Sequence, residues 1–193
     1  MRFGSLVFIF AAAVAGAAMA LAGTWAEDDA AVMACFAAMD REPALAVVNP
    51  RFARRDPTAA QLADAGMPSE AEAAALRLRV QKTRPCREKR LAAVRAHHLL
   101  LEPAYATLYY QSDQVFDYLT QDFVTYGTAN HLARDALVAF RAREAAYFGA
   151  RDEVERAALS EGWSEALQRA HSYPPPDSGP RSCAWQGPNI VCE

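Results

Sequence analysis

The chain has 193 residues and a formal net charge of −3, and 52% of its residues are hydrophobic. This mild acidity argues against a general nucleic-acid-binding protein, which needs a basic surface. Alanine is abundant and long alternations of Val, Ile and Thr are absent, so the sequence predicts an all-α fold.

The first 26 residues resemble an export signal in composition. Arg2 precedes an apolar or small-residue stretch from Leu6 to Ala22. Small-x-small cleavage patterns end at Ala20, Ala22 and Ala26. Residues 1–26 are therefore predicted to be a signal peptide, and the mature protein to be periplasmic. The alternative is an uncleaved anchor in the inner membrane, because the stretch is nearly long enough to span a bilayer of ~30 Å.

The four cysteines predict disulfide bonds. They are Cys35, Cys86, Cys183 and Cys192. An even number of cysteines in an exported chain favours disulfides over free thiols. Closeness in sequence favours a Cys183–Cys192 bond, which leaves Cys35 for Cys86. A zinc site is the alternative, and it is disfavoured because neither C-x-x-C nor close Cys/His spacing occurs.

Residues 27–172 are predicted to form one helical domain that begins with three helices. Val32, Cys35, Phe36 and Met39 form the apolar stripe of the first. A short second helix is expected between Asp56-Pro57 and Gly66. Ser69 and Glu72 form a capping box, which predicts a third helix over residues 70–82.

A long antiparallel helical hairpin is the predicted centre of the bundle, with Pro85–Phe123 against Thr128–Ala170. Seven-residue spacing of apolar residues recurs on both sides of Gly127, which we expect to end the first long helix in the left-handed conformation. Thr128 is expected to cap the second long helix. Pro103 is expected to bend that helix. Three facing pairs follow from this register: Val115 with Phe140, Leu108 with Tyr147, and Leu101 with Val154.

The C-terminal region differs in composition from the helical domain before it. Residues 173–181 are rich in proline and predict an extended linker. Residues 182–193 predict a β-hairpin that turns at Gly187-Pro188, with Cys183 opposite Cys192 and Trp185 opposite Ile190. A lone hairpin is marginally stable in water, so the disulfide is expected to staple it.

Metal-binding signals are weak. His98 with Glu102, and His131 with Asp135, have the four-residue spacing that places two ligands on one helix face. Two ligands are too few for a tight site. The favoured interpretation is that His98 fills a position between helices and that His131 lies on the surface.

No catalytic residue and no cofactor is predicted. The chain lacks a G-x-S-x-G elbow and the glycine patterns of Walker and Rossmann sites, and its cysteines are expected to be oxidised.

Two surface features are candidates for contacts. Six basic residues surround Cys86: Lys82, Arg84, Arg87, Lys89, Arg90 and Arg95. We expect them to pair with Glu161 and Glu165, the alternative being an anionic lipid or cell-wall polymer. Four aromatic residues form a possible interaction surface if they are exposed: Tyr109, Tyr110, Phe116 and Tyr118. Packing against the N-terminal helices is the favoured account.

These observations predict an exported, periplasmic, non-catalytic binding or adaptor protein with a protein partner in the cell envelope. The first alternative is a metal-binding or metal-responsive helical protein. The second is a cell-envelope enzyme with a cleft between the N-terminal helices and the hairpin. Nucleic acid is not an expected partner, and a membrane is one only if residues 1–26 are retained. The sequence leaves the oligomeric state open.

Overall fold

The structure is a computed structural model that describes residues 23–53, 56–171, 183–187 and 189–192. Most of the predicted signal peptide and all of the predicted linker lie outside the described residues. The described chain is mainly helical with a small two-stranded antiparallel sheet, as the sequence predicts.

The elements follow one another in a simple order. They are α1 (Trp25–Asp40), η1 (Pro43–Leu45), α2 (Ala59–Leu62), α3 (Glu70–His97), η2 (Leu99–Leu101), α4 (Glu102–Thr120), α5 (Tyr126–Gly149), α6 (Glu153–His171), β1 (Cys183–Gln186) and β2 (Asn189–Cys192).

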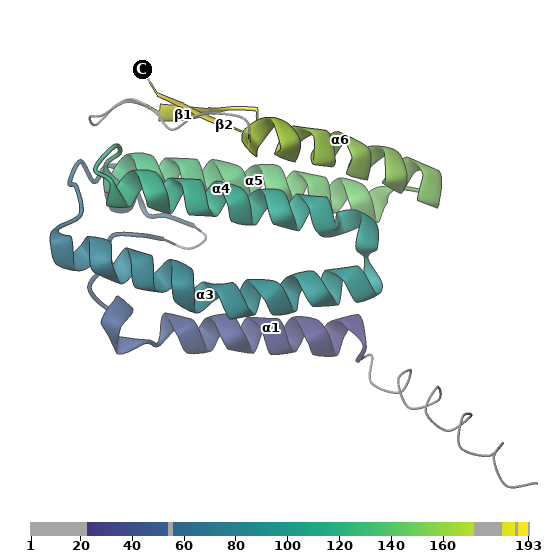
Figure 1. The fold of residues 1–193 in the computed structure, drawn as a ribbon, viewed down its shortest axis with the longest axis horizontal. Helices are drawn as coiled ribbons and strands as arrows, with labels where there is room; N and C mark the ends of the chain where they lie inside the picture. Colours follow the sequence, from purple (N-terminus) through teal and green to yellow (C-terminus); the bar gives the residue numbers. More distant parts are fainter. Residues whose placement is uncertain (1–22, 54–55, 172–182, 188, 193) are drawn as a thin grey trace, which may run out of the picture.

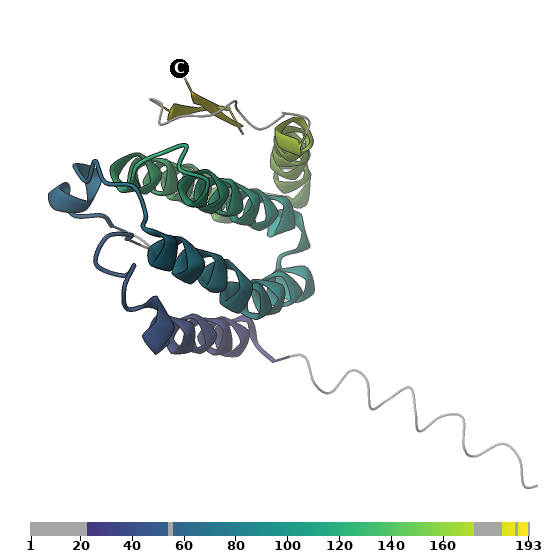
Figure 2. The same cartoon turned by 60° about the vertical axis from the view of Figure 1, so that its left-hand side comes forward.

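The long helices stack in layers (Figure 1). α1 lies along α3, and α3 in turn packs against α4. α4 and α5 form an antiparallel pair, and α6 covers α4 on the side away from α3 (Figure 2). In the part of the chain that the structure describes, no helix combines the length and the apolar character needed to cross a membrane.

The third helix begins where the sequence predicts it. The Ser69 side chain accepts a hydrogen bond from the backbone N–H of Glu72, whose carboxylate accepts one from the Ser69 backbone. Thr24 and Glu27 make the same reciprocal pair at the start of α1. Such boxes satisfy backbone donors that have no partner inside the helix.

The predicted disulfide between Cys35 and Cys86 is confirmed and joins α1 to α3. Few side chains of α1 are buried, Val32 and Met39 among them. The covalent bond therefore supplies part of the attachment that a larger apolar face would otherwise provide.

The predicted long hairpin is wrong in its first half. α3 does not stop before Pro85 but continues through it to His97, and a new helix starts at Glu102. Pro103 lies in the first turn of α4, where its missing N–H costs nothing, so it starts a helix rather than bending one. The second half also breaks, between Gly149 and Glu153.

The predicted register of the hairpin is wrong as well. The ring of Phe140 packs on Tyr105, with 4.6 Å between centroids, and Phe140 and Val115 belong to different apolar clusters of the core. Val154, expected opposite the buried Leu101, is 80% exposed. Apolar residues seven apart lie on one face of a helix, two turns from each other. This spacing therefore predicts which face packs, but not how far along the partner helix each residue lies.

The turn between α4 and α5 uses different residues from those predicted. Asp122, with a φ of 59°, takes the left-handed conformation expected of Gly127. Thr125, not Thr128, caps α5. Gly127 lies inside the first turn of α5, where its backbone N–H donates to the carbonyl of Asp64 at 2.7 Å.

A polar cluster fastens the segment before α3 to the start of α5. The Arg51 guanidinium binds both carboxylate oxygens of Asp64, at 2.8 and 2.9 Å, and lies 4.0 Å from the Tyr126 ring centroid. The hydrogen bond from Arg51 holds the pKa of Asp64 below its ordinary value. Asn130, 1% exposed, accepts from the Ala53 backbone and donates to the Arg51 carbonyl.

The C-terminal hairpin pairs Cys183 with Cys192 and Trp185 with Ile190, in the register that the sequence predicts. Cys183 is disulfide-bonded. The Cys192 side chain lies outside the described residues, so the Cys183–Cys192 bond stays a prediction. The hairpin packs on α5, because Ile190 is buried and the Trp185 indole donates to the Leu132 carbonyl at 2.7 Å.

Candidate functional site

A cavity of about 460 Å³ lies between α1, α3, α4 and α5. The buried apolar residues of the bundle form two clusters, one around Phe116 and Leu119 and the other around Tyr105 and Phe140. The cavity takes lining residues from both clusters. It therefore occupies the space where the two halves of the core do not meet.

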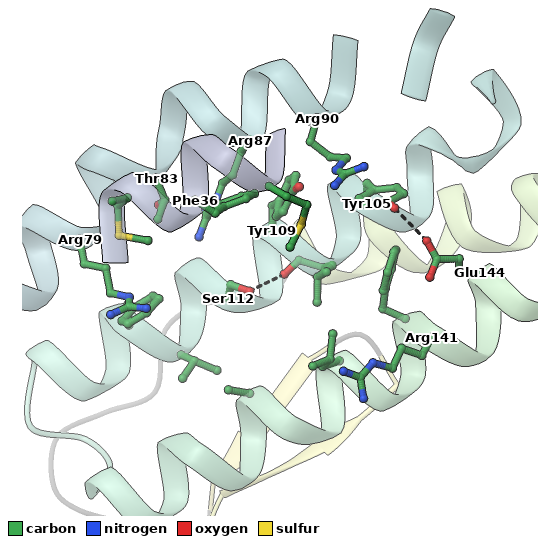
Figure 3. A pocket seen from close by; sticks show the side chains of 18 of the residues that line it. Phe36, Arg79, Thr83, Arg87, Arg90, Tyr105, Tyr109, Ser112, Arg141 and Glu144 are labelled. Carbon is green, nitrogen blue, oxygen red and sulfur yellow. Dashed lines mark hydrogen bonds between the residues drawn. The ribbon is translucent and has the colours of Figure 1, made fainter. Parts of the chain in front are cut away.

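One side of this cavity is a polar stripe on α3. Arg79, Thr83, Arg87 and Arg90 follow one another at spacings of four, four and three residues, which puts them on one face of a helix. Figure 3 shows the four side chains along the cavity. The Arg79 and Arg90 residues are 4% and 6% exposed, which is rare for arginine.

Each arginine of the stripe has an acidic partner nearer the solvent. Arg87 pairs with Asp113 and Arg90 with Asp29, and these two carboxylate side chains are 43% and 42% exposed. Arg79 pairs with Asp40 at 3.3 Å and donates to Asn49 at 2.9 Å. Positive charge thus points inward at the cavity, while much of the balancing negative charge lies toward the surface.

The other walls are mainly apolar. They comprise Met33, Phe36 and Met39 from α1, Phe52 from the following loop, Leu108, Val115 and Phe116 from α4, and Ala133, Leu137 and Phe140 from α5. A cavity with apolar walls and a few fixed charged groups is typical of small-molecule binding sites.

The remaining polar groups of the lining are mostly occupied. The Tyr105 hydroxyl donates to the Glu144 carboxylate at 2.8 Å, and burial raises the pKa of Tyr105 above its ordinary value. The Thr83 and Ser112 hydroxyls donate to backbone carbonyls of their own helices. The described lining residues include neither histidine nor cysteine. The hydroxyls of Tyr105, Thr83 and Ser112 thus already donate a hydrogen bond within the protein.

The candidate metal ligands lie apart from the cavity. The His98 ring packs against the rings of Trp25, Tyr147 and Phe148. Glu102 pairs with Arg95 at 2.6 Å. Residues 23–53, 56–171, 183–187 and 189–192 contain no group of three or more side chains arranged to hold a metal ion.

The second metal candidate is a surface pair. His131 is exposed on α5, and the Asp135 carboxylate pairs with the neighbouring Arg134 at 3.0 Å. Neither the described surroundings of His131 nor those of His98 supply a third ligand.

The packing of His98 leads to a pH-dependence prediction. Burial, with the nearby His97 and Arg156, lowers the pKa of His98 below its ordinary value of 6.5. When the pH falls below this value, the unfolded chain takes up a proton that the folded protein still excludes. Folding stability is therefore complete above this value and falls as the pH drops below it.

We expect the urea-derived free energy of unfolding to decrease between about pH 7 and pH 5. His98→Phe, which keeps a ring among the three aromatic neighbours, should flatten this decrease. His131→Gln, on the surface, should not. An equal slope in the wild type and in His98→Phe would contradict the assignment.

The four aromatic residues proposed as an interaction surface divide into two pairs. Phe116 and Tyr118 are 7% and 8% exposed, so they belong to the core and not to a surface. The Phe116 ring packs on Phe52, with 4.9 Å between centroids. Tyr109 and Tyr110 are half-buried, and Tyr109 lines the cavity. Phe116 and Tyr118 are therefore packed in the core, while their packing against the N-terminal helices stays a prediction.

The basic run on α3 pairs with different acids from those expected. Lys82 pairs with Glu42, Arg87 with Asp113, Arg90 with Asp29 and Arg95 with Glu102. The predicted partners Glu161 and Glu165 lie on α6, which packs on α4. Because α3 is a separate helix paired with α1 and α4, its charges meet those of α1 and α4.

Sequence reasoning missed the arginine stripe because it ended the third helix at Lys82. With that boundary, Arg79 falls on one helix and Arg87 and Arg90 on another. The available signal was the spacing of Arg79, Thr83, Arg87 and Arg90, which fits one helical face only if Pro85 lies inside the helix.

Comparison with known proteins identifies no relative, so the site is interpreted from its own residues. No protein-family model, curated protein or solved structure matches the chain significantly.

Proposed function

We propose that the protein is a non-catalytic binding protein of the bacterial cell envelope, and that it holds a small, largely apolar ligand in the cavity between α1, α3, α4 and α5. The observation that carries this proposal is the cavity itself. Protein interiors are close-packed and contain few voids larger than a water molecule. A space of about 460 Å³ between two apolar clusters falls within the ~300–1,000 Å³ range of ligand pockets.

Export is supported by two features. The Cys35–Cys86 disulfide is of a kind that persists mainly in oxidising compartments, and the apolar N-terminal stretch precedes α1. Cleavage after Ala20 or Ala22 would keep the Thr24 cap of α1. Cleavage after Ala26 would remove both that cap and Trp25, whose ring lies 4.8 Å from His98.

Binding inside the bundle is better supported than an adaptor role of its aromatic surface. Two of the four aromatic residues expected to form that surface are buried. The enzyme alternative expects a cleft between the N-terminal helices and the hairpin, and the observed cavity is lined by α1, α3, α4 and α5. The hydroxyls of Thr83 and Ser112, however, are bonded to backbone carbonyls and that of Tyr105 to Glu144, and no histidine is among the described lining residues.

Filling the cavity tests the proposal. An uncharged dye whose fluorescence rises in apolar surroundings, N-phenylnaphthylamine, is titrated into the purified mature protein. We expect saturable binding, and a loss of affinity of at least about tenfold in Ala133→Trp, because the indole would occupy space that the dye needs. Ala142→Trp places the same side chain on an exposed position of α5 and should leave binding unchanged.

Leu137→Trp fills the cavity from a neighbouring position and serves if Ala133→Trp does not fold, which far-ultraviolet circular dichroism and cooperative thermal unfolding will show. Dye binding of wild-type strength in both filled and folded variants would place the ligand elsewhere and contradict the proposal.

A further inference from the structure

We infer that the ligand is an anionic amphiphile, an apolar chain or ring system with one carboxylate or phosphate head group, and that Arg87 and Arg90 bind the head group. The inference rests on the proposed function, because it names the chemical class of ligand for the same cavity.

The cavity lining carries more guanidinium groups than carboxylates. Of the described lining residues, four are arginines and two are carboxylic acids: Arg79, Arg87, Arg90, Arg141, Asp29 and Glu144. The lining therefore carries a surplus of two positive charges, four minus two. Glu144 already accepts the Tyr105 hydroxyl. Asp113, the partner of Arg87, does not line the cavity. A ligand inside consequently meets more guanidinium groups than carboxylates.

Arg87 and Arg90 have more hydrogen-bond donors than their ion pairs use. A guanidinium group has five N–H donors in a planar fork that matches two oxygens of a carboxylate or phosphate. The ion pair of Arg87 runs through Nη1 to one oxygen of Asp113, and that of Arg90 runs through Nη1 to one oxygen of Asp29. Nη1 carries two of the five N–H donors of each guanidinium, so the Nε and Nη2 donors lie outside these contacts and can serve a second anion.

Aromatic rings hold both arginines in place. The Arg87 Cζ lies 5.1 Å from the Tyr109 ring centroid. The Arg90 Cζ lies 5.5 Å from the Trp25 ring centroid and 5.7 Å from that of Tyr105. Aromatic faces attract guanidinium groups and limit their rotamers. A preorganised cation loses less conformational entropy when it binds its ligand, which favours specific recognition of an anion.

An apolar surface lies next to the arginine stripe of α3. Figure 3 shows Phe36 beside Arg87 and Tyr109. The walls contributed by α1, α4 and α5 are otherwise mainly aliphatic and aromatic. An inorganic anion would leave these walls uncovered, whereas an amphiphile covers them with its tail and presents its head group to α3.

The ligand class is tested with four compounds of the same chain length and different head groups. Dodecanoic acid, dodecyl phosphate, dodecanol and dodecylamine each displace N-phenylnaphthylamine from the mature protein, below their micelle-forming concentrations. We expect the acid, the phosphate or both to bind at least about tenfold more tightly than the alcohol, because charge-assisted hydrogen bonds form only with the anions. The amine should bind most weakly. The ratio of acid to phosphate identifies the head group.

Variants locate the head group on α3. Arg87→Gln should weaken binding of the anion about tenfold and that of dodecanol little. The matched control is Arg84→Gln, an exposed arginine on the same helix that does not line the cavity. Asp113→Asn removes the carboxylate that competes for Arg87 and should tighten anion binding severalfold. A gain of affinity does not arise from misfolding, so this variant keeps the test informative if Arg87→Gln is unstable.

Each outcome separates the two proposals. Equal binding of acid, phosphate and alcohol, or tightest binding of the amine, would overturn the anionic ligand class while the cavity remains the binding site. Weaker anion binding by Asp113→Asn would also overturn the role of Arg87. Absence of dye binding to the wild-type protein, together with absence of a thermal shift by any of the four compounds, would overturn the proposed function as well.

Discussion

Removing the Cys35–Cys86 disulfide with Cys35→Ala/Cys86→Ala is expected to lower the free energy of unfolding by about 4 kcal/mol and the melting temperature by roughly 10 °C. The bond closes a loop between residues 51 apart in sequence, and cross-linking a loop of that length restricts the unfolded chain strongly. Alanine is chosen because Cys86 is 2% exposed, and a serine there would bury a hydroxyl group.

The same variant should weaken ligand binding. α1 carries four residues of the cavity lining: Asp29, Met33, Phe36 and Met39. Apart from the disulfide, α1 is joined to α3 by polar contacts such as the ion pair of Arg90 with Asp29 and the 2.9 Å hydrogen bond between His97 and Asp28. Exposed or half-exposed ion pairs contribute little stability, so the covalent bond is expected to decide how firmly α1 closes the cavity.

Chemical reduction provides the control. Dithiothreitol should lower the stability of the wild-type protein by a similar amount and should affect Cys35→Ala/Cys86→Ala much less, with any remaining effect assigned to Cys183. Unfolding is measured by urea titration monitored by circular dichroism. A loss below about 1 kcal/mol in the double variant would show that packing alone holds α1 in place.

Features with a local chemical cause could be predicted from the sequence. The Ser69–Glu72 box starts α3 because the two side chains satisfy backbone groups only three residues away. The hairpin of β1 and β2 turns at Gly187, whose φ of 64° suits a residue without a side chain. The Cys35–Cys86 pairing followed from the closeness of the other two cysteines. None of these predictions required knowledge of the tertiary structure.

The path of the chain through Pro85 could not be predicted from local rules. A proline inside a helix lacks its N–H and loses one backbone hydrogen bond, so a helix boundary is the ordinary expectation. Here Pro85 and Gln81, whose carbonyl loses its partner, are both exposed, so the carbonyl is open to solvation and the lost bond costs less than it would in the core. Buried residues on both sides, Thr83 and Cys86, hold the helix against its neighbours. Tertiary packing thus outweighs the local preference.

The cavity could not be predicted from the sequence either, because it also depends on tertiary packing. Its polar side depends on α3 being continuous, and its apolar sides come from three other segments. The arginines looked like an ordinary solvated basic run, because their burial depends on the approach of α1 and α4. Charge density alone does not distinguish an arginine that faces solvent from one that lines a cavity.

The largest effect expected from a single small substitution is at Gly127. A Cβ atom there would lie 2.5 Å from the Leu62 carbonyl oxygen and 2.9 Å from that of Asp64. Both are backbone atoms, which do not move aside as a flexible side chain does. The same approach lets the Gly127 N–H donate to Asp64 and the Tyr126 N–H donate to Gly66. The close contact therefore fastens the segment before α3 onto the start of α5.

Gly127→Ala is accordingly expected to lower the free energy of unfolding by about 3 kcal/mol, the upper part of the range for inserting a methyl group into a packed site. Gly162→Ala is the matched control, since Gly162 lies inside α6 with nothing within 4 Å of the added Cβ. That variant should gain about 0.5–1 kcal/mol from helix propensity. Urea titration of both variants gives the comparison. If Gly127→Ala were as stable as Gly162→Ala, the segment around Leu62 and Asp64 would not pack on α5, and the Phe52 wall of the cavity would lose its support.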